Sequence, residues 1–265
     1  MPVQQTRHPL LPLMVETIER QTWCHRILEW VILDGTPDAA SDQWSDFVCA
    51  ARAMLSKSPR TRHIQLVDAG ERASPALRTI GCFRNRIIDT MRGEWGVWMD
   101  DDDVYPNTRV QVAVELMEKE NKEVAGCSPH YIVDPDLGNM TFQFKVFGMM
   151  HATNNTMAFR RSLLSRTRYD DHAKNAEEPS FLQKHTIPMA QIPPEHAVMQ
   201  IAHKNNTYNK RELLMIALVA EWFQPDLQAR VSCRYVGRSP TAFVRVSQRI
   251  YNAYVQHLFP DLMTN

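Results

Sequence analysis

The chain has 265 residues, which suits one large domain or two small ones and is long enough to bury a full core. Its 30 basic and 30 acidic residues cancel, so no global field draws it to nucleic acid or to an anionic membrane. No apolar run approaches 18 residues, and the opening MPVQQTRHPLL is not a signal sequence, so we expect no transmembrane segment. The five cysteines are scattered without a CxxC pair, which indicates reduced thiols and a cytoplasmic protein.

The first half of the chain alternates between predicted helices and short strands that end in aspartate. Amphipathic or capped segments predict helices over 12–23, 42–56, 74–93 and 107–119, and compact apolar runs predict strands over 30–33, 63–67 and 97–99. Asp34, Asp68 and Asp100 follow these strands. The alternation predicts an α/β fold with a mainly parallel sheet flanked by helices. Ligands bind at the carboxyl ends of such strands, so we expect the three aspartates to converge on one rim.

The second half is less regular. Its patterns predict strands over 124–133, 140–146, 156–164 and 200–203, and helices over 180–185, 210–223 and 243–258. This part therefore predicts a smaller mixed sheet followed by a mainly helical tail.

Four consecutive aspartates, Asp100 to Asp103, follow the apolar run Val97–Met99. Carboxylates this close repel one another unless a cation lies between them, and a hard divalent metal with oxygen ligands relieves that repulsion. Asp100 and Asp102 point to one side if strand geometry continues, and Asp102 is the first choice for a direct ligand. Asp101 or Asp103 would contact a substrate or bind through water. The alternative is a solvated acidic turn, although a plain turn favours Gly, Asn or Ser.

Arg84 lies on the apolar stripe of its predicted helix, between Ile80 and Ile87. An arginine in that position is costly unless it pairs with carboxylate or phosphate. The alternative is a side chain that extends along the apolar surface to reach water.

Five segments together resemble the family 2-like group of glycosyltransferases with the GT-A fold, over residues 2 to about 205. These segments are Arg7-His8-Pro9, Glu29–Gly35, Gly81–Asn85, Gly93–Asp103 and Glu177-Glu178. They occur in the order and at roughly the spacing that the family shows.

The resemblance implies a nucleotide-sugar donor, Mn²⁺ or Mg²⁺ as cofactor, and a glycan, lipid-linked or protein-linked acceptor. It implies that a metal site draws on the acidic run and a late histidine, and that the donor pocket draws on charged residues of the first half. The metal candidates are Asp102, Asp100, Asp103 and His203, and the donor-binding candidates are Asp34, Arg7, Arg84, Asp68, Asp100 and Asp101. Asp34 alone also fits a turn cap, and His203 alone also fits a structural histidine.

The late pair Glu177-Glu178 is the candidate catalytic base. The resemblance implies an inverting reaction, in which a carboxylate deprotonates the acceptor hydroxyl. The family usually has Asp at the second position, so the choice between Glu177 and Glu178 stays open. The alternative is a helix N-terminus, where Glu is favoured in any case. The segment 147–155 is where relatives shape the acceptor pocket.

The predicted organisation is a GT-A domain over 1–209, with a nucleotide-sugar-binding half over 1–123 and an acceptor half over 124–209, and a mainly helical extension over 210–265. One departure stands out: the family has a full apolar strand before the segment that resembles Arg7-His8-Pro9, and here only Met1-Pro2-Val3 precedes Gln4. Either the start lies further upstream or another segment fills the gap.

Two other functional classes fit parts of the sequence. Asp100-x-Asp102-x-Val104 matches the nucleophile motif of haloacid-dehalogenase-like phosphatases, with Asp170-Asp171 as a later acidic pair, but that motif normally opens the chain. The short first strand also fits a non-catalytic module that binds carbohydrate or metal.

Overall fold

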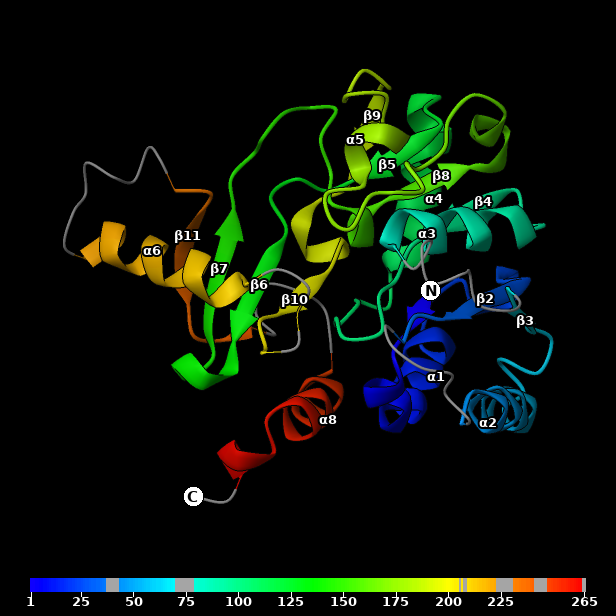
Figure 1. Cartoon of the computed structure of the whole chain (residues 1–265), viewed down its shortest axis with the longest axis horizontal. Helices are drawn as coiled ribbons and strands as arrows, with labels where there is room; N and C mark the ends of the chain where they lie inside the picture. Colours follow the sequence, from blue (N-terminus) through cyan, green and yellow to red (C-terminus); the bar gives the residue numbers. More distant parts are fainter. Residues whose placement is uncertain are drawn as a thin grey trace.

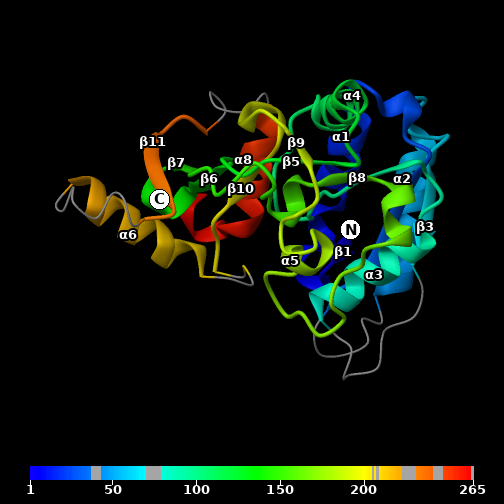
Figure 2. The same ribbon diagram turned by 90° about the horizontal axis from the view of Figure 1, so that it is seen from above.

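The structure, a computed structural model, describes residues 1–36, 43–69, 79–204, 206, 209–222, 231–240 and 247–263. Helices and short strands alternate, and the strands form three sheets in the orders β1-β2-β3, β4-β8-β5-β9 and β10-β6-β7-β11. The first and third sheets lie at opposite ends of the molecule, with the second sheet between them (Figures 1 and 2). The predicted α/β fold with a parallel sheet and further mixed strands is confirmed.

The first sheet is parallel and carries helices on both faces. It consists of β1 (Pro2–Val3), β2 (Glu29–Asp34) and β3 (Gln65–Asp68). The helices α1 (Leu11–Glu19) and α2 (Trp44–Lys57) pack on one face, since Trp30 and Ile32 share an apolar cluster with them. The helix α3 (Ile80–Thr90) packs on the other face against Val31 and Leu33. Strand side chains alternate between faces, and both faces are apolar here because both are covered.

The second sheet is mixed. It consists of β4 (Trp95–Val97), β5 (Val124–Gly126), β8 (Ala158–Arg160) and β9 (Met189–Gln191), and β8 runs antiparallel to both of its neighbours. The helix α4 (Arg109–Glu120) lies against β5 and β9. The predicted strand over 97–99 is shifted, because β4 ends at Val97 and Trp98 continues pairing through a hydrogen bond from its N–H to the Met157 carbonyl, 3.0 Å away.

The third sheet draws on distant parts of the chain. Its strands are β6 (Tyr131–Asp134), β7 (Met140–Phe144), β10 (Met199–Ile201) and β11 (Cys233–Gly237). The predicted strand over 124–133 is wrong as one element, because β5 and β6 belong to different sheets. Neither β9 nor β11 was predicted, because three or five residues of mixed polarity give little periodicity.

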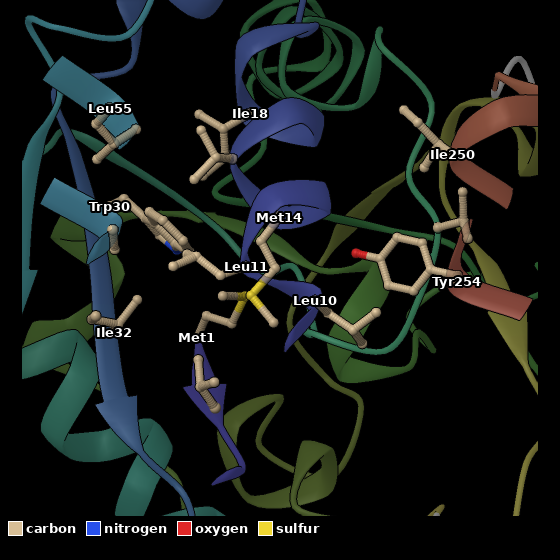
Figure 3. Packing of buried hydrophobic residues seen from close by; sticks show 14 of the residues in the cluster. Met1, Leu10, Leu11, Met14, Ile18, Trp30, Ile32, Leu55, Ile250 and Tyr254 are labelled. Atoms are coloured by element: carbon tan, nitrogen blue, oxygen red, sulfur yellow. The ribbon is translucent and has the colours of Figure 1, made fainter. Parts of the chain in front are cut away.

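The segment from residue 210 onward packs on both ends of the molecule. The helix α6 (Lys210–Trp222) packs against β11, while α8 (Gln248–Leu258) packs against α1. Ile250 and Tyr254 of α8 lie in the same apolar cluster as Leu10 and Met14 (Figure 3). Short elements complete the fold: α5 (Glu178–Phe181), η1 (Gln5–Leu10), η2 (Cys24–Arg26), η4 (Pro135–Leu137), η5 (Asn154–Thr156), η6 (Arg161–Ser165), η7 (Pro194–His196) and η9 (Pro260–Met263). The boundary at residue 209 stays a prediction.

The predicted helix start at Ser74-Pro75 lies outside the described residues. Within them, Thr79 caps α3 by accepting a hydrogen bond from the N–H of Cys82 at 3.2 Å. None of the helices in the described ranges is both long and apolar enough to cross a membrane.

Gly81 allows the chain around Asp170 to lie directly on the first turn of α3. A Cβ at this position would lie 1.9 Å from the Asp170 carbonyl oxygen, and the Gly81 N–H donates to the Ala173 carbonyl. We expect Gly81→Ala to destabilise the protein by about 2 kcal/mol or more, because backbone rather than a flexible side chain must move. Urea unfolding measures this. Ala53→Gly, a change of similar size in the exposed middle of α2, should cost only about 1 kcal/mol. Equal losses for the two variants would contradict the close packing.

Candidate active site

The four aspartates lie in a turn that follows β4, and three of them are buried. Asp101, Asp102 and Asp103 are exposed by 2%, 7% and 2%, while the side chain of Asp100 is 27% exposed. The N–H of Asp100 donates to the Tyr105 hydroxyl at 2.7 Å. Burial on this scale is inconsistent with a solvated acidic turn and requires partners for each carboxylate.

Arg7, which follows β1 in η1, supplies one such partner. Its Nη1 lies 2.5 Å from Asp101 Oδ1 and its Nη2 lies 3.0 Å from Asp102 Oδ2. The N–H of Gln4 also donates to Asp101 at 3.2 Å. Burial alone would raise the pKa of Asp102, but the charge of Arg7 and a hydrogen bond from His203 outweigh it and hold the pKa below the usual range. Burial raises the pKa of Asp101 to about 6 even though Arg7 opposes the shift.

The other side of the turn contacts the segment after β10. His203 Nε2 lies 2.9 Å from Asp102 Oδ2, and Asn206 Nδ2 lies 3.4 Å from the same oxygen. Asp103 accepts from Asn155 Nδ2 at 2.6 Å and from the Ile201 N–H at 3.3 Å. Burial raises the pKa of Asp103 to about 7. The turn therefore joins β4, η1, η5 and β10 at one point.

Arg84 connects the acidic turn to the late glutamate pair. The α3 helix places its guanidinium 4.5 Å from the centroid of the Trp98 ring, 3.0 Å from Asp100 Oδ1 and 3.5 Å from Glu177 Oε1. The side chain is buried, and although burial favours the neutral form, Asp100 and Glu177 keep its pKa above the ordinary value. The predicted charge partner of Arg84 is therefore present, and the alternative of a side chain that merely reaches water is excluded.

Glu178 begins α5 on the same side of the molecule as Arg84. Its Oε1 accepts a hydrogen bond from the N–H of Asn154 at 2.9 Å. Burial, and then the negative charge of Glu177, raise the pKa of Glu178 to about 7. A carboxylate with this pKa takes up and releases a proton near neutral pH, as general-base catalysis requires.

Asn154 and Asn155 were not singled out by the sequence, although both lie at the end of the segment expected to shape the acceptor pocket. The Asn154 N–H holds Glu178, and the Asn155 side chain holds Asp103. Both asparagines are buried, so one short 3₁₀ helix, η5, fixes the spacing between the acidic turn and the glutamate pair.

Asp34 and Asp68 lie at the carboxyl ends of β2 and β3, as predicted. Asp34 Oδ1 accepts from the Thr36 N–H at 3.0 Å, which is the turn-cap contact. Asp68 Oδ2 accepts from Trp44 Nε1 at 3.0 Å. Their donor-binding roles stay predictions.

A sequence model of the family described as glycosyl transferase family 2 matches residues 83–172, a range that holds Arg84 and the whole acidic turn. No curated protein matches the chain.

Among solved structures, the chain resembles S. aureus TarS. Over the TarS 1–349 fragment in complex with UDP-GlcNAc, the TM-score is 0.55 at 12% identity, covering 97% of this chain and 82% of that one. Over the longer TarS chain, the TM-score is 0.51 at 12% identity, with 85% of this chain covered. The chain spans 40% of the length of that longer protein. The fold and the family match together identify the chain as a glycosyltransferase of the GT-A, family 2-like group.

Proposed function

We propose that the protein transfers a sugar from a nucleotide-diphosphate sugar to an acceptor hydroxyl, with a divalent metal and inversion at the anomeric carbon. The observation that carries this is the linked charge arrangement: a buried acidic turn, the cations Arg7 and Arg84 beside it, and Glu178 with a pKa near 7 beyond Arg84. The TarS complexes with UDP-GlcNAc and with UDP support the donor class.

Asp102 and His203 suit a divalent cation that takes its other ligands from phosphate. Their facing atoms are 2.9 Å apart, and the pKa of Asp102 is held low, so the carboxylate is ionised. Among the described residues, no group of three His, Cys, Asp or Glu side chains is arranged to hold a metal by itself. Mg²⁺ and similar ions commonly bind through one or two carboxylates plus substrate phosphates. The exposed edge of Asp100 offers a further oxygen.

The metal, when bound, would offset negative charge on the leaving diphosphate. The chain's own residues do the rest of the work. Arg84 lies between Asp100 and Glu177, where its charge holds both carboxylates and attracts a diphosphate. Glu178 accepts the proton of the acceptor hydroxyl as the sugar–oxygen bond forms. Asn154 holds Glu178 in place through its backbone N–H.

A thermal-shift screen tests the donor class. We expect UDP, UDP-GlcNAc or another nucleoside diphosphate to raise the melting temperature only when Mn²⁺ is present. At a hundredfold excess over the dissociation constant the gain is about 2.7 kcal/mol, or roughly 5–10 °C for a chain of this size. Mn²⁺ alone and inorganic phosphate with Mn²⁺ are the controls. If no nucleotide shifts the melting temperature under either condition, the proposed donor class is wrong.

A further inference from the structure

An apolar cavity of about 610 Å³ separates the first two sheets. Its walls come from β2, β4, α1 and α3, and they include Trp30, Val31, Met14, Ile18, Ile87 and Ile88. Protein interiors contain few voids larger than a water molecule, and a cavity with apolar walls offers water few partners. This space therefore has the character of a place that a missing apolar element would fill.

The cavity lies in line with β1, which is only two residues long. Pro2 pairs with Leu33 and Val3 pairs with Asp34, so β1 covers only the last part of β2. The Met1 amine donates to the Val31 carbonyl at 2.7 Å, which points the chain along the uncovered part of β2. In the same register, the position before Met1 lies beside Val31 and the next two lie beside Trp30 and Glu29. About four residues would span this stretch at roughly 3.3 Å each.

Both strands that border the cavity present backbone groups to it. Leu33 and Gly35 donate to Met1 and Val3, so by the twofold alternation of a strand the backbone groups of Val31 and Glu29 face the same side. On the far side, β4 is the edge strand of its sheet, and it pairs with β8 alone. Exposed strand edges facing an apolar slot are templates for another strand.

The Met1 amine is buried, which is costly for a charged terminus. Burial, and then the positive charge of Arg84, lower the pKa of this amine to about 4. Met1 itself is only 9% exposed and lies beside α1, between Trp30 and Leu10 (Figure 3). A peptide N–H in the same place would donate the same hydrogen bond without carrying a charge.

We propose that the cavity is the seat of an extended apolar segment of about four residues joined to the amine of Met1, so that β1 continues upstream. The segment would pair with β2 on one side and approach β4 on the other, and the two sheets would become one. This inference does not depend on the proposed reaction, because it rests on the sheet edges and the cavity alone.

The walls also specify the composition of the segment. Val3 and Met1 face the cluster of α1, and the alternate positions face Ile87 and Ile88 of α3. Because both faces are apolar, the segment should be a continuous run of Val, Ile or Leu rather than an alternating one.

The test compares forms of the full chain that carry four added residues before Met1. We expect Val-Ile-Val-Ile to raise the melting temperature by about 5–10 °C and to slow hydrogen exchange at Val31 and Val97 at least tenfold. A Gly-Ser-Gly-Ser extension of equal length is the matched control and should change neither. A Thr-Val-Thr-Val form, which is less prone to aggregate, is measured alongside and should show an intermediate shift.

Equal melting temperatures for the apolar and Gly-Ser forms, with unchanged exchange at Val31, would overturn the proposal. The acetylated peptide Val-Ile-Val-Ile is also added in trans to the original chain. If this peptide protects Val31 and the joined extension does not, the occupant is a separate chain and the proposal is equally wrong.

Discussion

Glu178→Gln is expected to lower the turnover number by about 10²- to 10⁴-fold while leaving donor affinity nearly unchanged. The reason is that Gln keeps the size of the side chain and can still accept the hydrogen bond from the Asn154 N–H, but it cannot take a proton from the acceptor. Turnover is measured under donor saturation, and donor affinity by thermal shift. A collapse of donor binding with normal turnover of the bound complex would contradict the base role.

The pH profile gives this prediction its sharpest form. The base must be deprotonated to act, so turnover should rise with pH and level off above about 7, where Glu178 ionises. Glu177→Gln is the matched control one residue away, and since Glu177 pairs with Arg84, this variant should weaken donor binding and keep the rising limb. If the limb disappears in Glu177→Gln instead, Glu177 is the base.

Stability should change in the opposite direction to activity. The pKa of Glu178 is raised from 4.5 to about 7 in the folded state, so its contribution is fully present below about 4.5 and is lost as pH rises through about 7. Gln mimics the protonated form at every pH. Glu178→Gln should therefore be more stable than the native chain by on the order of 1–3 kcal/mol at pH 8 and equally stable near pH 4.

Asp102→Asn is expected to abolish metal-dependent donor binding and to reduce transfer at least a hundredfold. The variant removes the charge that Arg7 and His203 hold in place, and an amide is a poor ligand for a hard cation. It leaves Arg7 with Asp101 as its carboxylate partner, so a stability loss of about 1–3 kcal/mol should accompany the change. The Mn²⁺-dependent thermal shift with UDP should disappear.

Asp134→Asn separates the loss of stability from the loss of function. Asp134 is fully buried, pairs with Arg211 at 2.9 Å and caps η4, so its removal should destabilise the chain by a similar amount. It lies at the end of β6 in the third sheet, and transfer should persist. Full metal-dependent activity in Asp102→Asn, or its loss in both variants, would refute the assignment of Asp102.

The sequence alone determined the features that follow from local periodicity and charge density. The strand–helix alternation of the first half needs only the contrast between short apolar runs and amphipathic segments, and β2, β3, α1 and α2 lie close to their predicted bounds. Asp100–Asp103 could be singled out because four adjacent carboxylates are costly wherever they lie. Arg84 could be singled out because a charge on an apolar stripe requires a partner.

Only the tertiary structure decided which partners those charges have, because each is contributed by a segment far away in the chain. Arg7 meets Asp101 across 94 positions and His203 meets Asp102 across 101, and no local pattern encodes such pairings. The same holds for Asn154 and Asn155, whose role depends on where η5 packs. The short first strand was visible in the sequence, but its consequence, a cavity bordered by two strand edges and a buried amine, appears only when β2 and β4 are placed beside it.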